Sequence, residues 1–83
     1  MTTDEQTLRE RAQTTDATLR VGKGGVVAVA EELESQLGDR DLVKVKFLRA
    51  ARGGTTTDEL AERLAAQAGA DVIETRGNTA TYH

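Results

Sequence analysis

Within the stretch "DLVKVKFL", residues 43–47 alternate strictly between apolar and basic residues, and this stretch constrains the fold more than any other segment. Val43, Val45 and Phe47 must share one side of an extended chain, because successive side chains of a β-strand point to opposite faces. Lys44 and Lys46 then share the other side. The sequence therefore predicts a strand with one buried face and one open, basic face, and other elements have to cover the apolar side.

Glycines and capping patterns divide the rest of the chain into short elements. Apolar residues at three- and four-residue steps predict an amphipathic helix over residues 26–37, which Gly38 is expected to stop. Thr56 with Glu59 forms a capping-box pattern for a second amphipathic helix, and Gly69 is expected to end it. Each of these helices offers an apolar face with which to cover the sheet.

Three further patterns complete the predicted order. Thr3 with Gln6 begins a short polar helix, and residues 17–21, ATLRV, alternate as a strand. Two β-prone runs joined through Gly77 and Asn78 predict a terminal hairpin. The expected fold is α/β (α+β), in the order helix-strand-helix-strand-helix-strand-strand. A strand-helix-strand crossover followed by an antiparallel hairpin makes the four-stranded sheet mixed, with helices packed on it.

Composition argues against several classes of function. A chain of 83 residues can bury one modest core, so residues 1–83 are expected to form a single domain. There is no cysteine and the one histidine is His83, so neither a metal site nor a histidine base is expected. No apolar run could span a bilayer and no signal-peptide core precedes the domain, which favours the cytoplasm. We expect no enzyme, no cofactor, no membrane partner and no small-molecule substrate.

The charges are sorted along the chain, although the net charge is −3. Residues 42–57 carry four cations and no acid, and residues 18–25 carry two cations and no acid. Most acids fall on the predicted helices. Such sorting indicates a face kept for a polyanion, while an acidic surface with incidental basic strands is the alternative. The six cations are Arg20, Lys23, Lys44, Lys46, Arg49 and Arg52.

Strand parity places three of these cations together. Arg20 alternates with apolar neighbours, so it is expected on the same open face as Lys44 and Lys46. For any single strand lysine, solubility or protection of a sheet edge is the alternative role.

Residues 22–25, with the sequence GKGG, lie between a predicted strand and the start of a predicted helix. Free N–H groups and the positive end of the helix dipole favour an anion there, and glycine permits close approach. The phosphate-loop pattern G-x-x-x-x-G-K-S/T and the dinucleotide pattern G-x-G-x-x-G both fail. G-x-x-G remains, with which KH-type domains clamp a nucleic-acid backbone, or else a plain turn. The candidate loop residues are Gly22, Lys23, Gly24 and Gly25.

Four pieces of the chain occur in a fixed order: LRVGKGGV before the first amphipathic helix, DLVKVKFL, AAQAGADVI at the end of the second helix, and the terminal RGNTATYH. Together they resemble the YhbY or CRM (chloroplast RNA splicing and ribosome maturation) domain, from about Leu8 to Tyr82. The resemblance implies a fold similar to the C-terminal domain of translation initiation factor three. It also implies a stand-alone RNA-binding protein that associates with ribosomal RNA in precursors of the large subunit (pre-50S).

The resemblance also implies which segments contact RNA. Residues 22–25 match the family's loop, and Lys44 and Lys46 match its basic strand. The family is often basic overall, and this chain departs from it by being acidic. The expected roles are close backbone contact at the loop, phosphate pairing by Lys23, Lys44 and Lys46, supporting charge from Arg49 and Arg52, and a weaker contribution from Arg20.

The chain has two aromatic residues, Phe47 and Tyr82, and Phe47 is expected in the core. The chain therefore lacks a row of aromatic residues on which successive bases could stack, so we expect recognition of RNA shape and backbone. A DNA-binding, chromatin-type protein of similar small fold and a protein–protein adaptor are the alternative functions.

Overall fold

The computed structural model describes residues 5–83, with side chains from Thr7 onward, so the predicted cap formed by Thr3 and Gln6 lies outside the described side chains. The order of elements is the predicted one, with a 3-10 helix, η1, added in the segment expected to be a loop. The elements are α1 (Glu5–Ala12), β1 (Ala17–Val21), α2 (Val27–Asp39), β2 (Val43–Phe47), η1 (Arg49–Ala51), α3 (Thr57–Ala68), β3 (Val72–Arg76) and β4 (Thr79–Tyr82).

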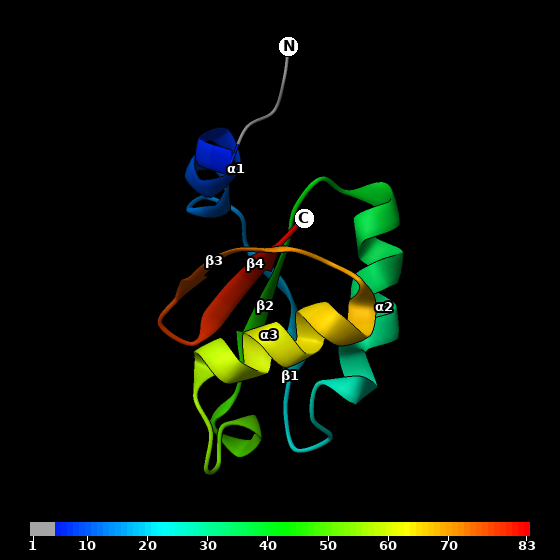
Figure 1. The fold of residues 1–83 in the computed structure, drawn as a ribbon, viewed down its shortest axis with the longest axis vertical. Coiled ribbons are helices and arrows are strands. Elements are labelled where there is room, and N and C mark those ends of the chain that lie inside the picture. The colour runs from blue at the N-terminus through cyan, green and yellow to red at the C-terminus, as the bar shows by residue number, and fades with distance from the viewer. Residues whose placement is uncertain (1–4) are drawn as a thin grey trace.

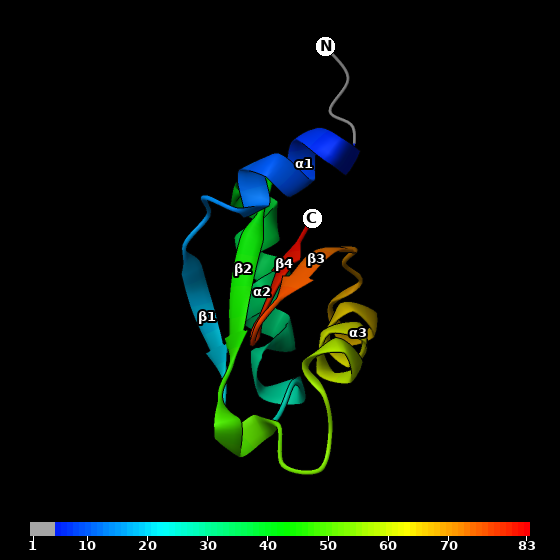
Figure 2. The ribbon, with the colours of Figure 1, turned by 90° about the vertical axis from the view of Figure 1, so that its left-hand side faces the viewer.

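The four strands form one mixed sheet in the order β1-β2-β4-β3. β1 and β2 are parallel and are connected through α2, whereas β4 is antiparallel to both β2 and β3. α2 and α3 cover one face of this sheet, and α1 lies at one end of it (Figures 1 and 2). The turn after β1 and the 3-10 helix η1 lie at the opposite end (Figure 1). The mixed sheet predicted from the sequence is therefore confirmed.

The alternating pattern of β2 divides its side chains between the two faces. Val43, Val45 and Phe47 are buried in the core with the apolar residues of α2 and α3, whereas Lys44 and Lys46 are only half-buried. Full burial of side chains of this kind contributes about 1.5–3 kcal/mol each to folding. The buried face of β2 thus fixes which side of the sheet the helices occupy.

Both aromatic side chains belong to this core. Phe47 and Tyr82 are each 0% exposed. The Tyr82 hydroxyl donates to the carbonyl oxygen of Ala61, at 2.8 Å, and so joins β4 to α3. Burial, and to a smaller extent the negative charge of Glu62, raises the pKa of the Tyr82 phenol. Neither ring is available for stacking on a base.

One predicted helix end is wrong and the other is confirmed. α2 continues through Gly38 to Asp39, and Arg40 then takes an extended conformation. Gly38 does not have a positive φ, so it does not form the left-handed cap that ends many helices. Gly69 does, with a φ of 67°, directly after α3.

α1 packs on the sheet through a small apolar cluster separate from the main core. The cluster contains Leu8, Leu42 and Ile73. An exposed ion pair, in which a guanidinium nitrogen of Arg11 lies 3.4 Å from a carboxylate oxygen of Asp41, links the end of α1 to the segment before β2. Exposed pairs of this kind contribute little, so the apolar cluster holds the helix.

Candidate nucleic-acid interface

The sheet face opposite α2 and α3 carries the strand cations, and Figure 2 looks onto this open face. Arg20 of β1 is exposed and pairs in register with Lys46 of β2. Residues paired in register point to the same side of a sheet. The structure therefore places Arg20 with Lys44 and Lys46, as strand parity predicts.

A fourth cation, Arg76 of β3, shares this face and is absent from the sequence prediction. Arg76 pairs with Thr79 across the terminal hairpin, and Thr79 pairs with Lys46. The signal was present in the sequence: a two-residue turn pairs the residues that flank it. With Ala80 and Tyr82 directed into the core, Thr79 and its partner must face outward.

The glycine loop lies at the end of β1, directly before α2. The Gly25 N–H donates to the Gly22 carbonyl oxygen at 3.0 Å, which closes a tight turn with exposed Lys23 and Gly24 at its tip. Gly25 has a φ of 78°, a backbone conformation that residues other than glycine rarely adopt. The backbone of this loop is thus accessible to a ligand at close range.

The helix that follows the loop begins without a cap. Val26 precedes α2 with no side-chain hydrogen bond, and no acid lies in the first turn. α3 begins in the opposite way, because the Thr56 hydroxyl accepts from the N–H of Glu59, and Asp58 and Glu59 lie in its first turn. The positive end of the α2 dipole is therefore not neutralised by the protein, which leaves it available to an external anion.

A second glycine-containing loop, which includes η1, lies beside the first. The Leu48 N–H donates to the Val21 carbonyl oxygen at 2.8 Å, so the chain leaving β2 runs next to the chain leaving β1. Arg49 is exposed and Arg52 is half-buried, with its Nε nitrogen lacking an acceptor. Both arginines belong to this end of the molecule, beside residues 22–25.

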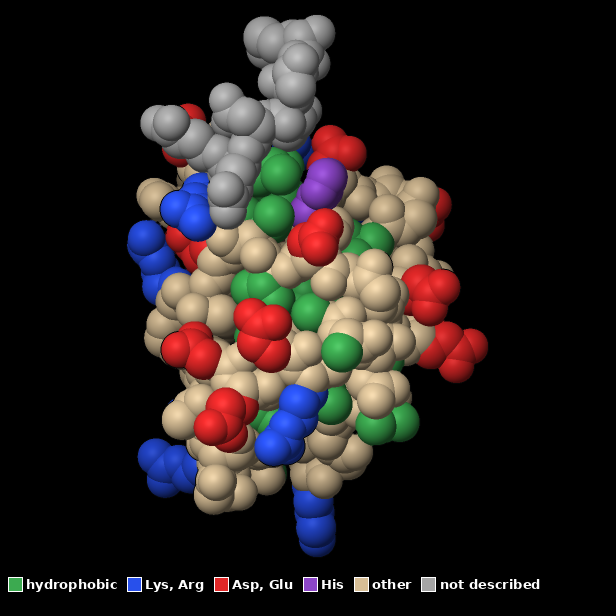
Figure 3. All heavy atoms as spheres, in the orientation of Figure 1, with side chains coloured by type: hydrophobic (Ala, Val, Ile, Leu, Met, Phe, Trp, Pro, Cys, Tyr) green, Lys and Arg blue, Asp and Glu red, His purple; other side chains and the backbone are tan. Residues whose placement is uncertain are grey.

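The site cations form no ion pairs, and most acids lie elsewhere. Within residues 5–83, none of the seven cations of the open face and the two loops forms an ion pair. Acidic side chains spread over the surface of α2 and α3, while basic side chains lie mainly at the left margin and lower end of this face, with one further basic side chain among the acids (Figure 3). Exposed acids on these helices include Glu31, Glu32, Glu34, Asp58, Glu59 and Glu62.

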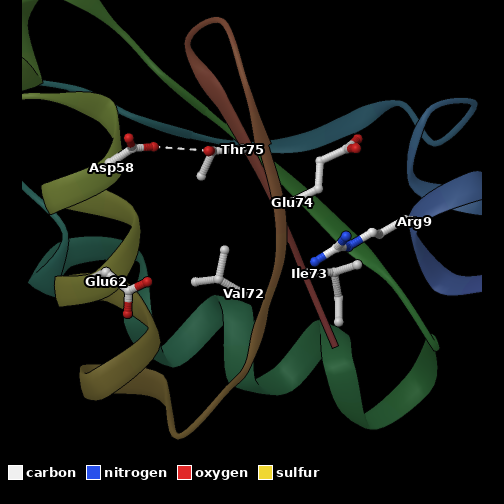
Figure 4. A pocket seen from close by; sticks show the side chains of 7 residues that line it. All are labelled: Arg9, Asp58, Glu62, Val72, Ile73, Glu74 and Thr75. Atoms are coloured by element: carbon white, nitrogen blue, oxygen red, sulfur yellow. Dashed lines mark hydrogen bonds between the residues drawn. The ribbon is translucent and has the colours of Figure 1, made fainter. Parts of the chain in front are cut away.

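A cavity of about 370 Å³ lies elsewhere, across the edge strand β3. Asp58, Glu62 and Thr75 line its α3 side, with Thr75 donating to Asp58 at 2.8 Å, while Glu74 and Arg9 lie on the side of α1 (Figure 4). Three carboxylates make this cavity unsuited to a polyanion.

In the part of the chain that the structure describes, no group of three or more His, Cys, Asp or Glu could hold a metal. None of the helices in the same part of the chain combines the length and the apolar character that a membrane span requires.

The fold and this interface define a small mixed-sheet domain with a predominantly cationic face, next to a glycine loop and a helix that begins without a cap. The chain belongs to the CRS1/YhbY (CRM) domain family, whose family model matches residues 1–83. It is similar to "Probable RNA-binding protein MJ0652" of Methanocaldococcus jannaschii, with 36% identity over 74 residues. That match covers 89% of this chain and 55% of the relative, so this chain spans about half the length of the relative.

A solved structure shows the same fold. It is the solution structure of hypothetical protein SAV1595 from Staphylococcus aureus, described as a candidate RNA-binding protein. The TM-score is 0.76 at 26% sequence identity, and the match covers 100% of this chain and 88% of that one. The family resemblance and the fold class inferred from the sequence are both confirmed.

Proposed function

We propose that this protein is a single RNA-binding domain that acts in the cytoplasm on ribosomal RNA, during assembly of the large ribosomal subunit. It binds without catalysing a reaction. The proposed contacts are residues 22–25, the strand cations Lys44, Lys46 and Arg20, and the loop cations Arg49 and Arg52. The observation that carries the proposal is the uncapped, acid-free start of α2 at the tip of a glycine loop, beside a face of unpaired cations.

Family membership and the names of two relatives support RNA as the ligand. MJ0652 carries the name "Probable RNA-binding protein", and SAV1595 is described as a candidate for the same activity. Because this chain spans 55% of MJ0652, the role of that whole protein is carried over here only as part of the proposal.

The geometry favours recognition of the sugar–phosphate backbone. Loop and helix N–H groups can donate to phosphate oxygens at the start of α2, while Lys23 adds a formal charge. Lys44 and Lys46 can pair with further phosphates on the open face. Since both aromatic rings are 0% exposed, base stacking contributes nothing from this chain's aromatic residues.

The loop is tested with the double variant Lys23→Ala/Gly24→Asp. A Cβ at Gly24 would lie 3.4 Å from the Cβ of Ala28, and Gly24 has no positive φ, so the fold should tolerate aspartate there. A carboxylate near the start of α2 also interacts favourably with the positive end of the helix dipole, which stabilises the helix. We expect unchanged or slightly raised thermal stability, together with at least about tenfold weaker binding of a fluorescein-labelled RNA hairpin with a single-stranded tail.

The matched control is Arg63→Ala/Gly38→Asp, which changes the charge equally on the helical side. Arg63 and Gly38 are both exposed, and a Cβ at Gly38 would meet nothing within 4 Å. This control should bind RNA like the wild type. If the loop variant is folded and binds as tightly as the control, the loop is not the RNA site.

Association with ribosome precursors is tested in cell extract. Sedimentation followed by crosslinking should recover the wild type on particles that precede the large subunit, crosslinked to large-subunit ribosomal RNA. The Lys23→Ala/Gly24→Asp variant should shift to the top of the gradient. If the wild type stays at the top of the gradient but binds purified RNA, RNA binding is supported and the role in ribosome assembly is not.

Duplex DNA has the same phosphate charge, so a DNA-binding, chromatin-type function is the alternative. Competition between the labelled RNA hairpin and an unlabelled DNA duplex decides between them. RNA binding predicts that the duplex competes poorly at physiological salt, because A-form geometry and 2′-hydroxyl groups are absent from B-DNA. Equal competition by DNA would favour the alternative.

A further inference from the structure

We infer that one RNA strand crosses the open face of the sheet along a row of side chains spanning all four strands, and that Arg76 is a further phosphate-binding residue at the end of that row. This path rests on the proposed function, because it concerns the same RNA. It adds Arg76 to the proposed contacts and gives the course of the RNA strand across the sheet.

The row follows directly from the strand register. Arg20 of β1 pairs with Lys46 of β2, Lys46 pairs with Thr79 of β4, and Thr79 pairs with Arg76 of β3. Side chains paired in register stand next to one another on one face. We call these four residues the cation row, since three of the four strands contribute a cation to it.

The neighbouring row on the same face is different. There Lys44 pairs with Thr81, and Thr81 pairs with Glu74, so one cation is matched by one acid. Thr81 is 1% exposed. This row lies nearer to α1, because Leu42, directly before β2, packs against that helix. Positive charge on the open face is therefore concentrated in the cation row, toward the glycine loop.

The backbone that carries Arg76 is held in place. The Thr79 hydroxyl donates to the Arg76 carbonyl oxygen at 2.8 Å, across the hairpin turn. The Phe47 N–H donates to the Asn78 carbonyl oxygen at 2.7 Å, which fastens the turn to the end of β2. The Arg76 side chain is exposed and forms no ion pair within residues 5–83. An unpaired guanidinium on a fixed backbone suits phosphate, which it can bind through two parallel hydrogen bonds.

The length of the cation row suits an extended polyanion rather than a small ion. Neighbouring strands lie about 4.8 Å apart, so Arg20 and Arg76 are separated by roughly 14 Å across the sheet. A small anion would engage one of these cations, whereas a nucleic-acid strand offers a phosphate every few ångströms along its length. Arg20 is two residues before Gly22, so the row begins at the glycine loop and leads away from it across β2 and β4.

Edge protection is the competing explanation for Arg76. β3 is an edge strand, and charged side chains on edge strands prevent pairing with another chain. That role needs no RNA, and it predicts no change in RNA affinity when the charge is removed. Binding measurements therefore separate the two explanations.

The test compares Arg76→Gln, Arg76→Lys and Arg63→Gln by anisotropy of the fluorescein-labelled RNA hairpin over a range of salt concentrations. Arg63 is exposed on α3, on the other side of the sheet, so it controls for loss of one charge. Arg76→Gln should bind about three- to tenfold more weakly, and its salt slope should be shallower by roughly 0.7 to 0.9, the value for one phosphate contact. Arg76→Lys should keep the wild-type slope, because an ammonium group still pairs with phosphate.

The outcomes distinguish the row from the loop. If Arg76→Gln matches the wild type while Lys23→Ala/Gly24→Asp loses binding, the RNA does not cross the sheet, and the proposed function stands. Equal weakening by Arg76→Gln and Arg63→Gln would also overturn the row, since the effect would then follow net charge. If the wild type itself does not bind the hairpin, the proposed function fails, and the path fails with it.

Discussion

The Tyr82 phenol connects the last strand to α3 inside the core, where its O–H donates to the Ala61 carbonyl oxygen. Only the neutral phenol can make this bond in a buried place, and burial together with Glu62 raises its pKa. A net gain of about 1 kcal/mol is typical for such a hydrogen bond. The residue that completes the sheet is therefore also a group whose protonation is linked to folding.

This linkage predicts a loss of stability at alkaline pH. The phenol of the unfolded chain ionises near the ordinary tyrosine pKa of 10.0, whereas the native phenol stays protonated at higher pH. Above pH 10 the unfolded state thus binds fewer protons than the native state, so the free energy of unfolding falls as pH rises. The expected slope is about 1.4 kcal/mol per pH unit, measured by denaturant unfolding of the wild type and of Tyr82→Phe.

Tyr82→Phe should lack this additional slope and should be about 1 kcal/mol less stable at neutral pH. Since the chain has one tyrosine and no tryptophan, tyrosinate absorbance follows Tyr82 alone and should show no titration of the folded protein near pH 10. A normal titration in the folded state, or equal alkaline slopes in both proteins, would contradict the linkage.

The two helix ends make a paired prediction at the level of the element. Gly38 lies within α2 without a positive φ and with open space around it, so Gly38→Ala should stabilise the protein by about 0.5–1 kcal/mol. Gly69 ends α3 with a φ of 67°, so Gly69→Ala should destabilise it by about 1–2 kcal/mol. Chemical denaturation of both variants is the measurement, and shifts of the same sign would contradict these assignments.

Local sequence patterns predicted most elements, because strand alternation and helix capping depend on residues that are close together in the sequence. Period-two alternation fixed the faces of Lys44 and Lys46, and the Thr56–Glu59 spacing located the start of α3, where the hydrogen bond to Thr56 is present. The end of α2 was misplaced, because a glycine can either cap a helix or continue it. Only the φ at Gly38 distinguishes these cases.

The interface was predicted less completely, since it depends on strands far apart in the sequence. Arg20 could be placed by parity within its own strand, but its neighbour depends on the pairing with Lys46. Arg76 was missed, although the hairpin turn predicts its pairing with Thr79, because its place beside Lys46 also requires the order β1-β2-β4-β3. The uncapped start of α2 likewise depends on where the helix begins, which the structure sets at Val27.

At the scale of the whole molecule, an acidic protein presents a cationic face because charge is separated across the sheet. The molecule measures 41 × 23 × 19 Å. At physiological ionic strength the Debye length is about 8 Å, so an acid on the far side of a helix is largely screened from a phosphate at the loop. The arrangement of charge, rather than its sum of −3, should then govern RNA affinity.

Neutralising distant acids tests this conclusion. Glu34 and Asp39 are exposed on α2 and lie about 10 and 18 Å along the helix from its first residue, at 1.5 Å per residue. Glu34→Gln/Asp39→Asn should change the affinity for the RNA hairpin by less than about twofold at physiological salt. Arg20→Gln/Lys46→Gln alters the same number of charges on the open face, and it should weaken binding by more than about tenfold.

The same pair of variants should respond differently to salt. When ionic strength falls to about 0.01 M the Debye length grows to about 30 Å, so removal of the two distant acids should then strengthen RNA binding measurably. A gain at physiological salt as large as the loss caused by Arg20→Gln/Lys46→Gln would show that net charge controls the affinity. A small gain that grows only at low salt would instead show that the RNA responds to the local field of the open face, which the acids of α2 reach only when screening is removed.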